Sequence, residues 1–325
     1  MNPEAQSYHN LNIALGANYE ALKKLKEKFG SWSKAWQKEK AGRPDSAPEL
    51  DSQLILKEDA DYPALLKEIS WAPLGLYIKG SLPDHPRIAI VGTRKATPNG
   101  KALAKQLARE LTLQGATVVS GLAMGIDEAA HQGAVEAGGQ TMAVLATGLD
   151  RIYPAQNTNL AHKILDLGGA LISEYPPESP SFPSNFVHRD RIISGLSLGV
   201  VVIEAPEKSG ALITAKFATE QNREIMAVPG PANHANYSGS HQLIRDGAKL
   251  VTSAKEILDE LNLEFAGVPA IKNTNATAEE NIILNTIREL GWPASIDKIS
   301  QITKMDIPKV NQIITLLTLR GILKE

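Results

Sequence analysis

The sequence contains no cysteine, which excludes a disulfide, a thiol nucleophile and a thiolate metal site. It also lacks an excess of either charge, because 34 lysines and arginines stand against 36 aspartates and glutamates and give a formal net charge of -2. This balance gives no support for a uniformly basic nucleic-acid binder. Any binding to a nucleic acid must therefore come from a local patch of the surface.

Long apolar runs are absent as well. No stretch is long enough to span a bilayer, and the N-terminus shows no apolar core of a signal peptide. We therefore expect a cytoplasmic protein without a membrane partner. The remaining composition is ordinary for a globular protein, with 43% hydrophobic and 22% charged residues, and 325 residues can fill more than one domain.

From about residue 85 onward, short apolar or β-branched runs alternate with segments of helical pattern. Thr97-Pro98 is typical of an N-cap and a first helical position, and predicts a helix through Leu111. Apolar strands that alternate with helices predict an α/β fold with a parallel sheet covered on both faces. The strands are expected at residues 87–91, 116–120, 141–146, 170–174, 199–204 and 224–228.

Linker composition at residues 41–48 and 264–277 divides the chain into parts. The first part has the apolar spacing of short helices, and we interpret its lysine run as a solvated helix face rather than a phosphate site. The parts are a small helical domain (1–48), a sheet domain (49–263) and a helical C-terminal module (278–325).

The C-terminal module shows helical segments at residues 278–290, 295–302 and 307–320, with a break at Gly291-Trp292-Pro293. This outline is that of a helix-turn-helix or winged-helix module. The apolar positions expected to form its core are Ile282, Ile283, Ile287, Leu290, Ile296, Ile299, Ile302, Val310, Ile313, Ile314 and Leu317.

Four glycine-bearing turns follow predicted strands: they lie at residues 91–94, 120–125, 148–151 and 209–214. In a parallel sheet such turns collect along one edge, where ligands bind. Backbone amides at helix N-termini attract anions, and glycine leaves them uncovered. The turns therefore favour a groove for a phosphate-bearing ligand, either a nucleotide or a nucleic-acid strand.

One of these turns invites a nucleotide-loop interpretation that its spacing excludes. A P-loop requires Gly-x-x-x-x-Gly-Lys-Ser/Thr. Here seven residues separate Gly92 from Gly100, and Lys101 is followed by Ala102. ATPase activity is therefore not expected. Arg94, just after Gly92, either clamps a phosphate or pairs with an acid on the surface, and the sequence leaves both open.

Two further clusters carry titratable groups. Asp127 and His131 lie four residues apart on one helical face, which suits a metal or an acid–base pair, but no third ligand is evident. We favour a structural role for both, in which Asp127 bonds local backbone. Phe186, Arg189 and Arg191 allow two interpretations. Either the ring stacks on a base and the arginines contact phosphates, or the ring belongs to the core and Asp190 neutralises one arginine. The sequence favours neither clearly.

Glu204 ends a predicted strand just before the turn at Ser209 and Gly210. A carboxylate that faces a phosphate would oppose binding. We therefore expect Glu204 to orient a loop or to accept a sugar hydroxyl.

Taken together, these segments resemble the DNA-processing protein A (DprA, or Smf) family. The resemblance runs in order from about residue 61 to 251. It is carried by Ile90-Val91-Gly92-Thr93-Arg94, Ser120-Gly121-Leu122-Ala123-Met124-Gly125-Ile126-Asp127, Ala129-Ala130-His131, Gly148-Leu149-Asp150-Arg151-Ile152-Tyr153-Pro154, Ser173-Glu174-Tyr175-Pro176, Arg191-Ile192-Ile193-Ser194-Gly195-Leu196-Ser197, Glu204-Ala205, Ser209-Gly210-Ala211-Leu212-Ile213-Thr214-Ala215, Ala227-Val228-Pro229-Gly230 and Leu243-Ile244-Arg245-Asp246-Gly247-Ala248.

The resemblance implies an extended Rossmann-like, doubly wound sheet, with a SAM- or helix-hairpin-helix-like domain before it and a winged-helix-like module after it. It further implies a homodimer that binds single-stranded DNA without strong sequence preference, protects it and promotes loading of RecA during natural transformation. No enzymatic activity, cofactor or metal is expected. Carried over, the DNA-binding residues would be Gly92, Thr93, Arg94, Gly121, Phe186, Arg189, Arg191, Ser209 and Gly210.

The sequence departs from the family pattern in two places. The family usually has asparagine where this chain has Asp190, and an added carboxylate weakens phosphate binding unless it pairs internally. The chain also ends at Glu325, too soon for a β-hairpin wing, and its last helix has few basic residues. Both duplex binding and protein contact therefore stay open for this module.

The alternative is a nucleotide-binding sensor or a phosphoribohydrolase-type enzyme. Rossmann-like enzymes of that type carry a Pro-Gly-Gly-x-Gly-Thr loop at the comparable turn. This chain has Pro206-Glu207-Lys208-Ser209-Gly210 there. The missing signature favours the strand-binding interpretation.

Overall fold

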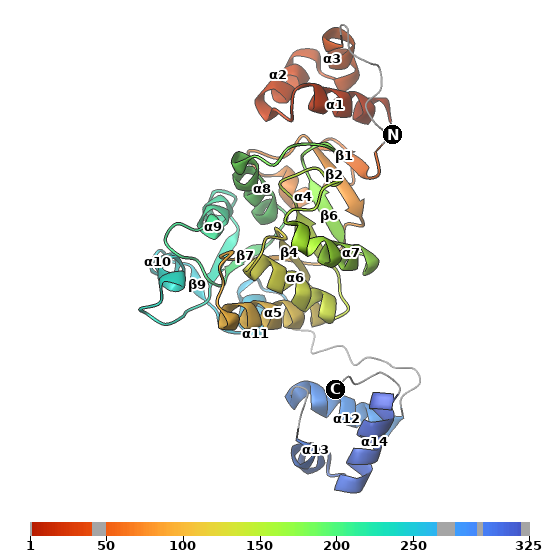
Figure 1. The fold of residues 1–325 in the computed structure, drawn as a ribbon, viewed down its shortest axis with the longest axis vertical. Helices are drawn as coiled ribbons and strands as arrows, with labels where there is room; N and C mark the ends of the chain where they lie inside the picture. Colours follow the sequence, from red (N-terminus) through yellow and green to blue (C-terminus); the bar gives the residue numbers. More distant parts are fainter. Residues whose placement is uncertain (1, 41–49, 265–276, 291–294, 320–325) are drawn as a thin grey trace. The chain divides into compact units, whose positions relative to one another are not determined.

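The computed structural model describes residues 2–40, 50–264, 277–290 and 295–319. The chain forms two compact units, Met1–Phe265 and Ala266–Glu325 (Figure 1). Within the described ranges, no helix combines the length and apolar character that a bilayer crossing needs.

A mostly parallel sheet of nine strands forms the centre of the first unit in the part of the chain that the structure describes. Its order is β1-β2-β6-β5-β4-β3-β7-β8-β9, with β1–β2 and β2–β6 antiparallel and every other pair parallel. The strands are β1 (Gln53–Leu56), β2 (Gly75–Gly80), β3 (Arg87–Val91), β4 (Thr117–Ser120), β5 (Thr141–Val144), β6 (Ala170–Ser173), β7 (Gly199–Val202), β8 (Glu224–Ala227) and β9 (Lys249–Leu250).

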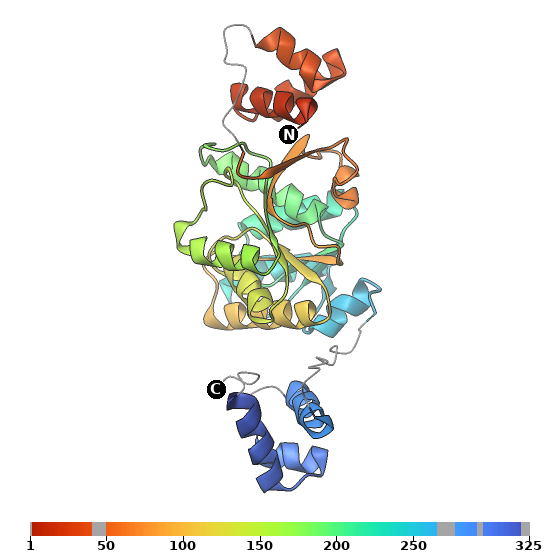
Figure 2. The same cartoon turned by 90° about the vertical axis from the view of Figure 1, so that its right-hand side faces the viewer.

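Helices cover both faces of the sheet (Figure 2), because successive strand residues point to opposite sides and both sides are apolar. In β3, Ala89 and Val91 pack with α4 (Ala64–Lys67), α8 (Pro183–Gly195) and α9 (Gly210–Glu220). Ile88 and Ile90 pack with the helices of the other face. These are α5 (Pro98–Leu113), α6 (Ile126–Glu136) and α11 (Ala254–Glu260). Two further helices complete the domain: α7 (Thr158–Asp166) lies beside α6, and α10 (Ser238–Arg245) follows β8.

The predicted fold class is confirmed. Each of the six predicted strands is present within a few residues of its expected bounds, and the Thr97 side chain caps α5 by accepting from the Gly100 amide at 3.0 Å. Three strands were not predicted: β1 and β2 extend the sheet at one end, and β9 extends it at the other.

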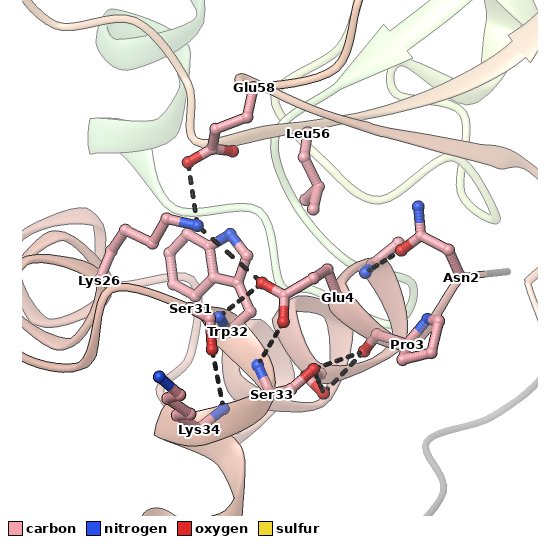
Figure 3. Close-up of polar contacts among 12 residues, drawn as sticks. Asn2, Pro3, Glu4, Lys26, Ser31, Trp32, Ser33, Lys34, Leu56 and Glu58 are labelled. Carbon is pink, nitrogen blue, oxygen red and sulfur yellow. Dashed lines mark hydrogen bonds and ion pairs between the residues drawn. The ribbon is translucent and has the colours of Figure 1, made fainter.

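Three helices precede the sheet: α1 (Pro3–Ala14), α2 (Tyr19–Phe29) and α3 (Trp32–Glu39). The Glu4 carboxylate accepts from the amides of Trp32 at 2.8 Å and Ser33 at 3.0 Å, at the beginning of α3 (Figure 3). An acid suits this position because the first amides of a helix have no intrahelical acceptor. Lys26 lies over the Trp32 ring and 3.1 Å from the Glu58 carboxylate of the sheet domain.

The N-terminal helices also contact the sheet through polar groups. The hydroxyl of Tyr77 on β2 lies 3.0 Å from His9 Nδ1 and accepts from Asn12 Nδ2 at 3.2 Å. All three side chains are buried. The helices therefore form one compact unit with the sheet, while the predicted linker at 41–48 lies outside the described residues.

The second unit contains α12 (Ala278–Leu290), α13 (Ile296–Thr303) and α14 (Ile307–Leu319) around a small apolar core. Ile283, Ile287, Ile299, Val310, Ile313, Ile314 and Leu317 are buried, as the spacing predicts. Two of the predicted core positions are wrong: Ile282 is 46% exposed, one residue off the buried face of α12, and Ile302 is 49% exposed in the last turn of α13.

Several predictions for this part of the chain fall outside the described residues. They are nearly all of the linker at 264–277, the break at 291–293, the chain end at 321–325, and the side chains of Leu290 and Arg320.

Candidate functional site

A crevice opens where β3 lies between β4 and β7. The chain leaves β3 towards α5 on one face of the sheet and leaves β7 towards α9 on the other, so the two loops diverge. In open α/β sheets this reversal of strand order is where ligands bind. A cavity of about 330 Å³ lies there, lined by Val91, Gly92, Thr93, Arg94, Ala123, Asp127, Arg189, Asp190, Ile193, Pro206, Lys208, Ser209, Gly210, Ala211 and Thr214.

The N-terminus of α9 faces this cavity. The Ser209 hydroxyl caps the helix by accepting from the Ala211 amide at 3.3 Å. Gly210 is the first helical residue, and a Cβ there would meet no atom within 4 Å. Its amide has no hydrogen-bond partner within the described ranges. A free amide at the positive end of a helix is a binding site for an anion.

Arg94 lies at the rim of the cavity, in the loop after β3. Its side chain is exposed, and among the described residues no carboxylate lies within 4 Å of it. The guanidinium carbon is 4.9 Å from the centroid of the Phe186 ring on α8, a cation–π contact. The free cation and an aromatic ring therefore lie side by side.

Arg189, one turn after Phe186, lies at the base of the cavity and is 4% exposed. Its Nη1 donates to the carbonyls of Gly121 at 2.5 Å and Val144 at 2.8 Å, at the ends of β4 and β5. Nε lies 3.1 Å from the Asp190 carboxylate. Arg189 is therefore a buried cation that ties two strand ends together and still lines the cavity.

Two buried carboxylates, Asp127 and Asp190, also line the cavity. Asp127 Oδ2 accepts from the Gly121 amide at 3.1 Å. Burial raises the pKa of Asp190 to about 7, and the charge of Asp127 adds to the rise, while Arg189 and Arg94 oppose it. Asp190 therefore titrates near neutral pH beside the cations of the cavity.

Of the two roles expected of Glu204, to orient a loop or to accept a sugar hydroxyl, the contacts in the structure match the first. Its carboxylate accepts from the Thr97 amide at 2.9 Å and from Asn236 Nδ2 at 2.9 Å, and holds the beginning of α5 against the loop after β8. Burial alone would raise the pKa of Glu204, but these hydrogen bonds outweigh it and the pKa is lowered. A Cβ at Gly100 would collide with this carboxylate.

The local contacts expected of Asp127 and His131 are present, since Asp127 accepts from the Gly121 backbone amide and His131 lies in the interior. His131 is fully buried, with Nδ1 2.8 Å from the Thr141 hydroxyl. Burial lowers the pKa of His131 to about 3, so the ring is neutral. Across the described part of the chain, no group of three or more His, Asp or Glu side chains could hold a metal ion.

Comparison with known proteins identifies the family. The model of the family "DNA recombination-mediator protein A" matches residues 53–262. This chain belongs to that family. It is 41% identical over 247 residues to Protein Smf of Synechocystis, a match that covers 74% of this chain and 60% of the relative, so the chain spans about three fifths of that relative's length.

Two solved structures of family members have the same fold. DNA processing protein A of Streptococcus pneumoniae has 40% identity and a TM-score of 0.62, and the match covers 66% of this chain and 75% of that one. DNA processing protein A of Helicobacter pylori has 28% identity and a TM-score of 0.59, covering 66% and 97%. The latter structure is described as giving insight into a single-stranded DNA binding mode.

The cavity of this family member brings together most of the residues predicted to bind DNA. Gly92, Thr93, Arg94, Arg189, Ser209 and Gly210 line it. Phe186 and Gly121 do not line the cavity themselves but contact residues that do. The Phe186 ring lies against Arg94, and the Gly121 carbonyl accepts from Arg189. The glycine turn at 148–151 does not line it; a Cβ at Gly148 would meet Asp150 and Pro176 instead.

Arg191 lies elsewhere, which does not fit its predicted place in the groove. Phe186, Arg189, Asp190 and Ile193 share the face of α8 that reaches the cavity, and Arg191 falls off this i, i+3, i+4, i+7 pattern. Its guanidinium binds both carboxylate oxygens of Glu174, at 2.8 and 2.7 Å, and lies 4.2 Å from the centroid of the Trp71 ring.

Lys208 lines the cavity but was not among the predicted site residues. Its side chain is exposed and immediately precedes Ser209 and Gly210. Lys208 could have been predicted from its position, because a cation directly before a glycine turn at a helix N-terminus is well placed to bind an anion.

Proposed function

We propose that this chain binds single-stranded DNA without strong sequence preference, through the cavity at β3 and β7 and its rim. The observation that carries the proposal is the pairing of Arg94 with Phe186 beside the free Gly210 amide. The cation and the helix N-terminus suit phosphates, and the ring suits a base.

The pairing favours a single strand over a duplex. A ring can stack only on a base that is not already stacked between neighbours, and stacking tolerates any base. The other groups in the cavity that can bind a strand are cations and a free backbone amide, which contact phosphates and do not distinguish one base from another. Weak sequence preference follows from both.

We further propose that the chain protects the bound strand and promotes RecA loading during natural transformation, and that it acts as a homodimer and as a binding protein rather than an enzyme. Family membership supports these roles. They are tested by RecA filament formation on strands coated with a single-strand binding protein, and by the mass of the protein in solution. Failure of both would leave strand binding as the whole function.

Fluorescence anisotropy at two salt concentrations tests strand binding directly. About five neutralised phosphates predict that log affinity falls with log salt at a slope of about -3.5, at roughly -0.7 per contact. Strands of about 20 nucleotides are long enough, since single-strand grooves in OB folds, taken as a guide, hold about 4–16 nucleotides per fold. Equal affinity for duplex, or affinity indifferent to salt, would contradict the proposal.

A nucleotide sensor or phosphoribohydrolase-type enzyme is the second candidate, because about 330 Å³ is also the size of a small-molecule site. Calorimetric titration with nucleoside monophosphates, together with a hydrolysis assay, separates the two. Tight mononucleotide binding with turnover would favour the enzyme over the strand binder.

A further inference from the structure

One tyrosine is much more exposed than the others. Tyr153 is 45% exposed, whereas Tyr8, Tyr62, Tyr77, Tyr175 and Tyr237 are each 7% exposed or less and Tyr19 is half-buried. Two of the buried tyrosines use their hydroxyls: Tyr62 donates to the Pro73 carbonyl at 2.8 Å, and Tyr77 accepts from Asn12 Nδ2 at 3.2 Å. Tyr153 instead leaves nearly half of its side chain in water, and it belongs to none of the apolar core clusters of the described residues.

Tyr153 lies next to the rim of the cavity. Its ring centroid is 5.4 Å from that of Phe186, with 63° between the ring planes. Arg94 already lies over the Phe186 ring, so Phe186 has two neighbours and is half-buried. Of the two rings, Tyr153 therefore offers the larger free surface to a base.

The loop that carries Tyr153 also carries a free cation. Arg151 is exposed, and among the described residues no carboxylate lies within 4 Å of it. Its neighbour Asp150 is turned to the backbone, where Oδ2 accepts from the Glu178 amide at 3.1 Å. Arg151 and Tyr153 thus repeat, in the loop after β5, the combination of cation and ring that Arg94 and Phe186 provide at the cavity.

We infer that Tyr153 and Arg151 form a second nucleotide subsite, in which Tyr153 stacks on a base and Arg151 contacts a phosphate. The inference rests on the proposed strand binding, and it defines the path of the bound strand across the protein surface. The strand would pass from the N-terminus of α9, past Arg94 and Phe186, to the loop after β5.

Affinity measurements with matched variants test the subsite. Tyr153→Ala should weaken binding of a strand of about 20 nucleotides roughly tenfold, as expected for one lost stack. Tyr153→Phe keeps the ring and should bind like the wild type. Arg151→Ala should weaken binding and flatten the salt slope by about 0.7, whereas Arg109→Ala, an exposed cation on α5, should not.

Photo-cross-linking locates the base independently. A strand with 5-iododeoxyuridine at every position should cross-link to Tyr153 in the intact protein, as mapped by mass spectrometry. If the wild type binds strands but Tyr153→Ala binds equally well and no cross-link forms there, the subsite is wrong while the proposed function stands. If the wild type binds no strand, both are overturned.

Discussion

The guanidinium of Arg189 occupies the space in which a side chain at Gly121 would begin. Nη1 donates to the Gly121 carbonyl at 2.5 Å, and a Cβ built at position 121 would overlap the guanidinium itself. Glycine is therefore needed at this strand end because any side chain would displace the Arg189 guanidinium. A ligand in the cavity would depend on Gly121 only through the position of Arg189. Close packing of this kind leaves no room for even one methyl group.

Gly121→Ala is therefore expected to lower the free energy of unfolding by about 1–3 kcal/mol, as overpacking does. The displaced Arg189 should also weaken strand binding. Urea unfolding and anisotropy measure the two effects. An alanine that leaves both unchanged would show that the guanidinium can move aside at no cost.

Gly210→Ala is the matched glycine variant, since a Cβ there meets open space. Its stability should stay the same or rise by roughly 0.4–1 kcal/mol, because alanine restricts the unfolded chain. Strand affinity should fall if a phosphate approaches the amide as closely as proposed. Unchanged affinity in this stable variant would remove Gly210 from the binding site.

Arg94→Ala should weaken strand binding across all sequences and reduce the salt slope by about 0.7, as for one lost phosphate contact. Arg94 is exposed and unpaired within the described residues, so stability should hardly change. Lys216→Ala removes a charge from the exposed side of α9 and serves as the control. Equal effects of the two variants would indicate general electrostatics instead of a defined site.

Strand affinity should depend on pH through Asp190, whose pKa burial raises to about 7. Protonation as the pH falls through 7 removes a negative charge from the cavity, which favours a polyanion by roughly 1–2 kcal/mol at an effective dielectric constant of about 20. Phosphodiesters do not titrate in this range. Affinity should therefore be higher at pH 6 than at pH 8.

Asp190→Asn should bind equally at both pH values, with the affinity that the wild type has at low pH. The variant should also gain stability at pH 8. The native carboxyl has a raised pKa and the unfolded one does not, so the wild type loses stability as the pH rises to 7. A pH dependence that persists in Asp190→Asn would assign it to another group.

Arg191 should matter for stability. Its side chain is 1% exposed and forms two hydrogen bonds with the Glu174 carboxylate. Glu174→Gln should cost about 3–5 kcal/mol in urea unfolding, because it leaves the buried charge of Arg191 without its partner. Arg191→Met should cost less, because the Glu174 carboxylate that it leaves is only partly buried. Double substitution by apolar residues should recover part of the loss. If Arg191→Met loses much strand affinity and no stability, Arg191 contacts the strand as the sequence predicted.

The parallel centre of the fold was predictable because its strands are buried on both faces. Such strands are continuous apolar runs, as in β3 and β7, and stand out in any sequence. β2 (Gly75–Gly80) is framed by glycines and β9 has two residues, so neither carries a periodic signal. β2, together with β1, extends one end of the sheet and β9 extends the other, and there the partner strand and not the pattern decides the pairing.

The alternation of strands and helices can be predicted from the order of residues alone, and so can the edge of the sheet at which the glycine turns lie. Whether an arginine there is paired or free cannot, because burial and pairing depend on residues that are distant in the chain. Arg94 is free beside Phe186, whereas Arg191 is bound by Glu174 and Trp71. Two residues of identical chemistry therefore differ in role through their neighbours alone.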